Sequence, residues 1–161
     1  MKKVVKFGGS SLASAEQFKK VGEIIHADAE RRYVIPSAPG KRFSKDTKVT
    51  DMLIDLASAV ISKEEYNEKL EAVVERYASI ARDFNLGDEI VDTVRNDLQS
   101  RIDKRPEDDA KFMDLMKAAG EDNSAKIIAA YLQSIGVDAK YINPRDAGLL
   151  LSDEFGNARV L

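Results

Sequence analysis

Two short runs of β-branched and aromatic residues lie near the N-terminus, with a helical pattern between them. The runs are Lys3–Phe7 and Tyr33–Ile35, and both have the composition of strands. From Ser14, where Gln17 three positions on completes a capping-box pattern, apolar residues recur at helical spacing to about Glu30. A strand, a helix and a strand in this order predict a parallel pair joined by a helical crossover. We therefore expect an α/β fold in which helices are layered on a mostly parallel sheet.

Helical patterns dominate the middle of the chain. Apolar spacing predicts a series of helices that begin or extend as follows: from Thr50–Asp51, over Tyr66–Phe84, over Ile90–Ile102, from Pro106 to Ala119, and from Asn123 to Ile135. Gly120 is expected to interrupt the last two, and Asn123 to cap the second of them. The stretch from about 62 to 105 is predicted to be a helical insertion, either packed on the sheet or forming a small lobe.

The C-terminal part of the sequence offers weaker strand signals. Val137–Ile142 alternates with period two and predicts a third strand, and Leu149–Leu151 is an apolar run that could form a fourth. Three or four strands are few for so many helices, because a parallel sheet is usually buried on both faces. We therefore expect an incomplete sheet with open edges, which favours self-association or marginal stability.

Composition excludes several classes of protein. The 161 residues fit one domain, and the absence of Cys excludes disulfides, thiol nucleophiles and Cys-ligated zinc. The single histidine, His26, excludes a two-His metal site, and we expect it to be a surface or packing residue. A net charge of −3 with dispersed basic residues disfavours nucleic-acid binding. No apolar run approaches the roughly 20 residues of a membrane span, and no signal peptide is recognisable, so the default location is cytoplasmic.

The first candidate for a binding site is the turn after the first predicted strand. There Lys6 is followed by Phe7, Gly8, Gly9 and Ser10. Glycines let backbone N–H groups approach an oxyanion, a following helix N-terminus favours negative charge, and a lysine can meet a phosphate as a point charge. The pattern matches neither the P-loop nor the dinucleotide fingerprint. A phosphate-binding turn and an ordinary strand-to-helix turn both remain open.

Two further candidates lie at later positions. Ser37 follows the second strand, where ligands of open α/β sheets bind, and Thr50 begins the next helix. Either residue is also common as a turn or N-cap residue. Glu121 and Asp122 follow Gly120 and could hold a substrate ammonium group, or could simply complement a helix dipole.

Four blocks together resemble the N-terminal part of the aspartate kinases, which belong to the amino acid kinase superfamily. The blocks are Lys6–Ser11, Val34–Ala38, Lys48–Asp51 and Gly120–Glu121, and they occur in the family's order. The resemblance implies a three-layer α/β/α sandwich with a mostly parallel sheet, interrupted by a helical insertion. It also implies ATP-dependent transfer of a phosphoryl group, with Mg²⁺, to the side-chain carboxylate of L-aspartate, the first step toward lysine, threonine and methionine.

The resemblance also assigns roles to individual residues. It makes Lys6 the catalytic, charge-stabilising lysine and places Gly8, Gly9 and Ser10 at the phosphates. It places Ser37, Thr50 and Glu121 at the aspartate site, with Glu121 holding the amino group. It identifies no metal-ligating residue.

Family members are longer than this sequence. They continue with the nucleotide-binding half of the kinase domain and with ACT regulatory domains, and full-length members are expected to be homo-oligomers. Residues 1–161 are therefore expected to be the N-terminal portion of the catalytic domain and to be inactive alone. The alternatives are a non-enzymatic half domain used for ligand binding or assembly, and a different amino acid kinase.

Overall fold

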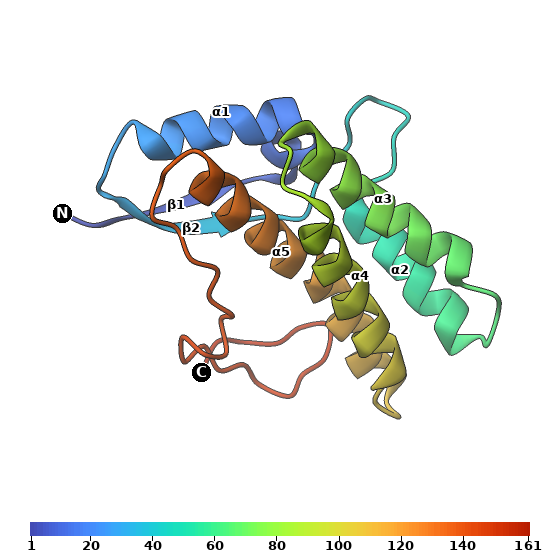
Figure 1. The fold of residues 1–161 in the computed structure, drawn as a ribbon. Coiled ribbons are helices and arrows are strands. Elements are labelled where there is room, and N and C mark those ends of the chain that lie inside the picture. The colour runs from blue at the N-terminus through green and yellow to red at the C-terminus, as the bar shows by residue number, and fades with distance from the viewer.

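The computed structural model describes every residue from Met1 to Leu161 and begins with a strand–helix–strand unit. Strand β1 (Lys3–Phe7) pairs in parallel with β2 (Arg31–Pro36), and α1 (Ala15–His26) connects them after a short 3₁₀ helix, η1 (Gly9–Leu12). Figure 1 shows α1 lying along the two strands. The predicted parallel pair with a helical crossover is confirmed.

The two-stranded sheet has one packed face and one open face. Phe7 and Val34 pack against the hydrophobic core. On the opposite face Val4, Tyr33 and Ile35 are at least half exposed. This alternation follows from the period of two along a strand, since Val4 pairs with Tyr33 in the register of the ladder. The α/β architecture with parallel strands is therefore present, with an incomplete sheet.

The remaining helices form a bundle beside the sheet (Figure 1). They are α2 (Val49–Ile61), α3 (Asn67–Asp83), α4 (Asp88–Asp103) and α5 (Asp109–Ser134). The contacts of α3 and α4 are chiefly with each other, with α2 and with α5. The predicted insertion is thus a helical hairpin packed on other helices. No helix is both long enough and apolar enough to cross a membrane.

Helix α5 runs through the position where the sequence predicts a break. Gly120 is buried in mid-helix, and a Cβ on it would lie 2.7 Å from the Cβ of Ala38. The glycine therefore provides room for close packing, which outweighs the roughly 1 kcal/mol that glycine costs in a helix. Asn123 caps nothing; it is buried, and its side-chain amide donates to Asp97 at 3.0 Å. The predictions of two helices and of an Asn123 cap were wrong.

The start and end of α1 also differ from the prediction. Ser14 occupies the N-cap position, but its side chain caps no backbone amide. The helix ends at His26 instead of near Glu30. A turn follows in which the Asp28 carboxylate accepts from the amide of Glu30 at 2.9 Å and pairs with Lys3 at 2.7 Å. Asp28 therefore offers the backbone an alternative to further helix.

The segment after α5 forms no third strand. Residues 137–142 alternate in exposure as predicted, but they lie along α5 and pair with no strand. The side-chain amide of Gln133 donates to the carbonyl of Ala139 at 2.7 Å and holds the segment there. The apolar run farther on makes only an isolated bridge between Leu151 and Val160. The predicted alternation of exposure is present in residues 137–142, but it arises because the segment packs against α5 and not because it is a strand.

Candidate active site at the strand ends

The turns that follow β1 and β2 cross each other closely. The amide of Ser37 donates to the carbonyl of Phe7 at 3.0 Å, and the amide of Gly40 donates to the carbonyl of Gly9 at 2.8 Å. A Cβ on Gly9 would lie 2.9 Å from the carbonyl oxygen of Ala38, and one on Gly40 would lie 2.7 Å from the carbonyl carbon of Gly9. Both glycines are therefore needed for two backbone segments to touch.

Lys6, near the end of β1, is followed by a turn whose first backbone amides have no acceptor in the chain. The Lys6 ammonium donates to the Ser37 hydroxyl at 3.4 Å, and both side chains stay accessible. The backbone amides of Gly8, Gly9 and Ser10 donate no backbone hydrogen bond. Free donors beside a lysine form a group that favours an anion. The Lys6–Ser10 turn is therefore a candidate anion site.

Glu121 reaches the region from α5. One of its carboxylate oxygens accepts the amide of Ala38 at 3.2 Å, while the residue remains exposed. The contact depends on the close approach of Gly120 to Ala38. The structure thus brings Lys6, Ser37 and Glu121, which are far apart in sequence, to neighbouring positions.

Thr50 is linked to the site less directly. It lies in the first turn of α2, whose N-cap is Lys48, so Thr50 is not the N-cap residue. The amide of Val49 donates to the carbonyl of Pro39 at 3.0 Å and joins this helix end to the Ser37–Gly40 segment. The Thr50 hydroxyl makes no hydrogen bond within the chain. The N-terminus of α2, which favours a negative group, is therefore tied to the loop that carries Ser37.

Buried side chains of α3 support both sides of the site. Arg76 is 5% exposed and forms an ion pair with Asp46 at 2.6 Å. Arg42 also pairs with Asp46, at 2.8 Å. Hydrogen bonds from Arg42, together with the neighbouring Arg76, hold the pKa of the Asp46 carboxyl far below its usual range despite burial. Tyr77 is fully buried, and its hydroxyl donates to the carbonyl of Gly120 at 2.7 Å.

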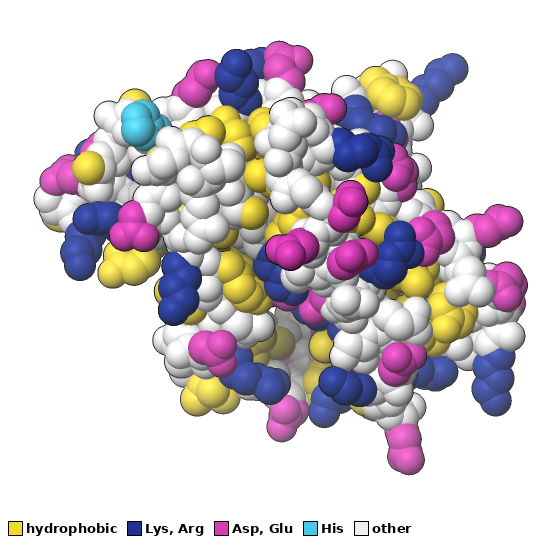
Figure 2. All heavy atoms as spheres, in the orientation of Figure 1, with side chains coloured by type: hydrophobic (Ala, Val, Ile, Leu, Met, Phe, Trp, Pro, Cys, Tyr) yellow, Lys and Arg dark blue, Asp and Glu magenta, His cyan; other side chains and the backbone are white.

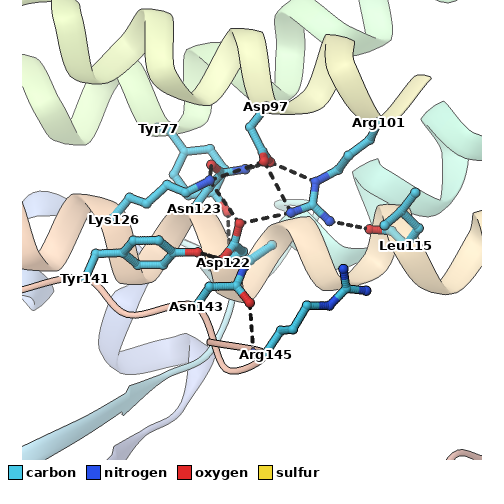
Figure 3. Close-up of polar contacts among 11 residues, drawn as sticks. Tyr77, Asp97, Arg101, Leu115, Asp122, Asn123, Lys126, Tyr141, Asn143 and Arg145 are labelled. Carbon is cyan, nitrogen blue, oxygen red and sulfur yellow. Dashed lines mark hydrogen bonds and ion pairs between the residues drawn. The ribbon is translucent and has the colours of Figure 1, made fainter. Parts of the chain in front are cut away.

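A second polar cluster lies between α4, α5 and the C-terminal segment (Figure 3). Arg101 pairs with Asp97 and with Asp122, in each case at 2.9 Å. Lys126 pairs with the same two carboxylates, at 3.2 Å and 2.9 Å respectively. The hydroxyl of Tyr141 donates to Asp122. Two cations thus balance two anions, and the cluster fastens three segments together.

The ionisation of this second cluster follows from its pairing. Burial alone would raise the pKa of the Asp97 carboxyl, but the hydrogen bond from Arg101 and the charges of Arg101 and Lys126 outweigh it, so the pKa is lowered. Burial and the hydrogen bond to Asp122 raise the pKa of Tyr141 to about 12. The carboxylates of Asp97 and Asp122 therefore have a structural role, since both are occupied by ion pairs within the chain.

The remaining candidates do not join the site. His26 is exposed in the last turn of α1, at the end of the helix that lies away from the glycine turn. Figure 2 shows it on the surface, on a face where acidic and basic side chains are interspersed. No three His, Asp or Glu side chains gather as metal ligands. Of the candidates named from the sequence, Lys6, Ser37 and Glu121 lie near one another, and His26 lies apart from them.

The sequence pattern contained an unused signal for the residues behind the site. Arg76 lies three positions after Val73 and four before Ile80, so it falls on the apolar face of its helix. A charged residue in such a stripe needs a buried partner. Asp46 provides that partner, but no local pattern indicates which acid of the chain would do so.

A comparison with protein families identifies the family to which the chain belongs. The amino acid kinase family model matches residues 1–161, and the chain belongs to this family. Aspartokinase 3 of Bacillus subtilis (strain 168) is 50% identical over 159 residues, which are 99% of this chain and 35% of that protein. Chloroplastic aspartokinase 1 of Arabidopsis thaliana is 30% identical over 162 residues, covering 98% of this chain and 28% of that protein. The chain therefore spans about a third of the curated relatives it matches.

Solved structures show the same likeness. An aspartate kinase of Clostridium acetobutylicum superposes with a TM-score of 0.72 at 37% identity, covering 81% of this chain and 29% of that one. Escherichia coli aspartokinase III, in complex with aspartate and ADP, gives a TM-score of 0.80 at 23% identity over 99% of this chain and 35% of that one. The second likeness shows the shared fold.

Proposed function

We propose that this chain belongs to an aspartate kinase that transfers the γ-phosphoryl group of ATP to the side-chain carboxylate of L-aspartate. The bond between the γ-phosphorus and the ADP oxygen breaks, and a bond from the carboxylate oxygen to phosphorus forms, which gives ADP and 4-phospho-L-aspartate. The observation that carries the proposal is the convergence of Lys6, Ser37 and Glu121 at the crossing of two glycine-containing turns. The similarity to aspartokinases supports this choice of substrate.

The glycine turn supplies what a transferring phosphoryl group needs. Phosphoryl transfer depends on positioning and on neutralising charge more than on a covalent nucleophile. The free amides of Gly8, Gly9 and Ser10 can bind phosphate oxygens, and the Lys6 ammonium can neutralise the charge that develops during transfer. The absence of cysteine is no handicap to such chemistry.

The aspartate side of the site is assigned to residues around Ala38. The exposed Glu121 carboxylate can accept the substrate ammonium group, and the Ser37 hydroxyl can hydrogen-bond a substrate carboxylate. The N-terminus of α2 at Thr50 favours the second carboxylate. L-Aspartate carries one ammonium group and two carboxylates, and the proposed site offers one acidic group and two groups that favour an anion.

The resemblance also implies Mg²⁺. No group of three His, Asp or Glu side chains gathers in this chain, whereas Mg²⁺ in kinase sites is usually held by one or two carboxylates together with substrate phosphates. The roles proposed for Lys6, Ser37 and Glu121 involve no metal ion. The cytoplasmic location and homo-oligomeric state of the enzyme stay predictions.

A chimera provides the test of the proposal. Residues 1–161 replace the matching segment of Bacillus subtilis aspartokinase 3, and release of ADP is followed with L-aspartate, L-glutamate and other amino acids. We expect turnover with L-aspartate and none with L-glutamate. Turnover with another carboxylate would identify a different amino acid kinase, and a folded but silent chimera would favour a non-enzymatic half domain.

The isolated chain is expected to behave differently. Because the relatives are about three times as long, we propose that residues 1–161 alone give no aspartate-dependent ADP release. The same coupled assay measures this. Turnover by the isolated chain would contradict the proposal that catalysis needs more of the kinase domain.

A further inference from the structure

Two adjacent residues of α3, in the helical hairpin of α3 and α4, contact the two segments that form the candidate site: the loop after β2 and the middle of α5. We infer that Arg76 and Tyr77 are positioning residues for aspartate binding, with Arg76 fixing the loop between Ser37 and Thr50 and Tyr77 fixing the part of α5 that carries Glu121. This inference rests on the proposed function. We call the two side chains the α3 brace.

Arg76 holds the loop by three separate contacts. Its guanidinium pairs with Asp46 at 2.6 Å and donates to the backbone carbonyls of Gly40 at 2.8 Å and Thr47 at 3.3 Å. These acceptors lie along the whole of the segment that connects Ser37 to Thr50. A planar guanidinium with several fixed donors suits such a junction better than an ammonium group does. Loss of Arg76 would leave the mostly buried Asp46 with Arg42 as its remaining cation.

Tyr77 holds the opposite side by one contact. Its ring is fully buried, and its hydroxyl donates to the carbonyl of Gly120 at 2.7 Å. Gly120 lies in mid-helix next to Glu121 and touches Ala38, whose amide donates to Glu121. The hydroxyl therefore fixes the point where α5 approaches the strand-end loop.

The contacts of Arg76 and of Tyr77 together fix the distance between the Ala38 amide and the Glu121 carboxylate. The loop fixed by Arg76 carries the Ala38 amide, and the helix fixed by Tyr77 carries the Glu121 carboxylate that accepts it at 3.2 Å. Glu121 is exposed, and its carboxylate has no hydrogen-bond partner in the chain other than the Ala38 amide. Its position therefore depends on where α5 and the Ala38 loop are held. Because Arg76 and Tyr77 are consecutive in one helix, movement of either side relative to the other requires breaking one of their contacts.

Conservative variants test the brace in the chimera described above. Tyr77→Phe removes only the hydroxyl, and we expect the KM for L-aspartate to rise about three- to tenfold, as loss of one hydrogen bond implies. We expect Arg76→Met to raise the same KM by more than tenfold and Arg76→Lys to recover part of that loss. The KM for ATP and the kcat should stay within about twofold for Tyr77→Phe.

Matched controls separate positioning from general destabilisation. Tyr131→Phe makes the same change at a buried tyrosine of α5 whose hydroxyl has no hydrogen-bond partner in the chain, and Arg82→Met removes an exposed arginine of α3. Both should leave the two KM values unchanged. The inference is overturned if Tyr77→Phe leaves the KM for L-aspartate at the wild-type value, or if the KM for ATP rises equally.

Hydrogen exchange in the 161-residue chain keeps this test separate from the proposed function. We expect Tyr77→Phe to speed exchange of the Ala38 amide severalfold and to leave the Val21 amide in α1 unchanged. If the wild-type chimera fails to phosphorylate L-aspartate, the proposed function falls, and the Ala38 amide still decides whether the brace orders the site. An unchanged exchange rate at Ala38 would refute the brace whatever the activity.

Discussion

Glu121 and Asp122 are neighbours in α5, yet they belong to two different kinds of charged cluster. Glu121 is exposed, and its carboxylate accepts only the amide of Ala38. Asp122 is mostly buried and is shared between Arg101, Lys126 and Tyr141 (Figure 3). Successive residues of a helix point in directions about 100° apart, so one acid faces the strand ends and the other faces α4.

The difference teaches how a structural charge is distinguished from a charge available to a ligand. In the second cluster each cation and anion has charged partners within the chain, which offsets the cost of burial. At the strand ends Lys6 and Glu121 have one neutral partner each and keep the capacity to bind. Charged side chains without a charged partner, next to backbone amides without an acceptor, therefore distinguish the candidate site from the second cluster.

The largest effect is expected at Lys6. Lys6→Met in the chimera removes the cation from the phosphate side, and kcat should fall by about 10²- to 10³-fold, as for loss of one preorganised charge-stabilising group. Steady-state kinetics with L-aspartate and ATP measure it. Lys2→Met, at an exposed lysine without an ion pair, should leave kcat unchanged. A kcat for Lys6→Met within threefold of wild type would remove Lys6 from the catalytic role.

The neighbouring acids should respond in opposite ways. Glu121→Gln should raise the KM for L-aspartate about 10- to 100-fold, because a charged hydrogen bond is lost, while stability changes by less than about 0.5 kcal/mol. Asp122→Asn should lower the free energy of unfolding by about 3 kcal/mol, because Arg101 and Lys126 lose a partner. Urea denaturation of the chain and kinetics of the chimera measure the two effects. Equal effects of both variants would erase the distinction between the clusters.

Acid should weaken the second cluster. The pKa of Asp97 is lowered from its ordinary 3.8 in the folded chain. Its ionised form therefore stabilises the fold above about pH 4, and that contribution is lost as the pH falls through the lowered pKa. Between pH 5 and pH 3, Asp97→Asn should lose less stability than the wild type.

Urea denaturation at each pH measures this slope. Asp138→Asn, at an exposed aspartate without an ion pair, is the matched control and should keep the wild-type dependence. An Asp97→Asn slope equal to that of the wild type would show that Asp97 does not contribute to acid sensitivity.

The smallest effect is expected at the end of the second cluster. Tyr141→Phe removes the hydrogen bond to Asp122 and should cost about 1 kcal/mol of stability. It should leave the KM for L-aspartate unchanged, because the network lies apart from Glu121. Thermal and urea unfolding of the chain measure the loss. A raised KM would mean that the two clusters are coupled through α5.

Much of the fold could be predicted because its signals are local. The strand at Lys3–Phe7, the glycine turn and the helical hairpin all follow from residue composition and apolar spacing. The failures came from contacts between distant segments. Gly120 looked like a helix break because the surface of Ala38 that it touches is far away in sequence, and residues 137–142 looked like a strand because packing on α5 produces the same alternation.

The sequence by itself determined which chemical groups the chain can bring to a site: a lysine at a strand end, glycines with free amides, and acids after a helical glycine. Only the tertiary structure decided which of those groups meet. Lys6, Ser37 and Glu121 become neighbours because parallel strands end at the same edge and because Gly120 lets α5 approach that edge. The same packing gives Glu121 and Asp122 different surroundings. The two side chains point in different directions from α5, and only the segments packed around the helix decide what each of them meets.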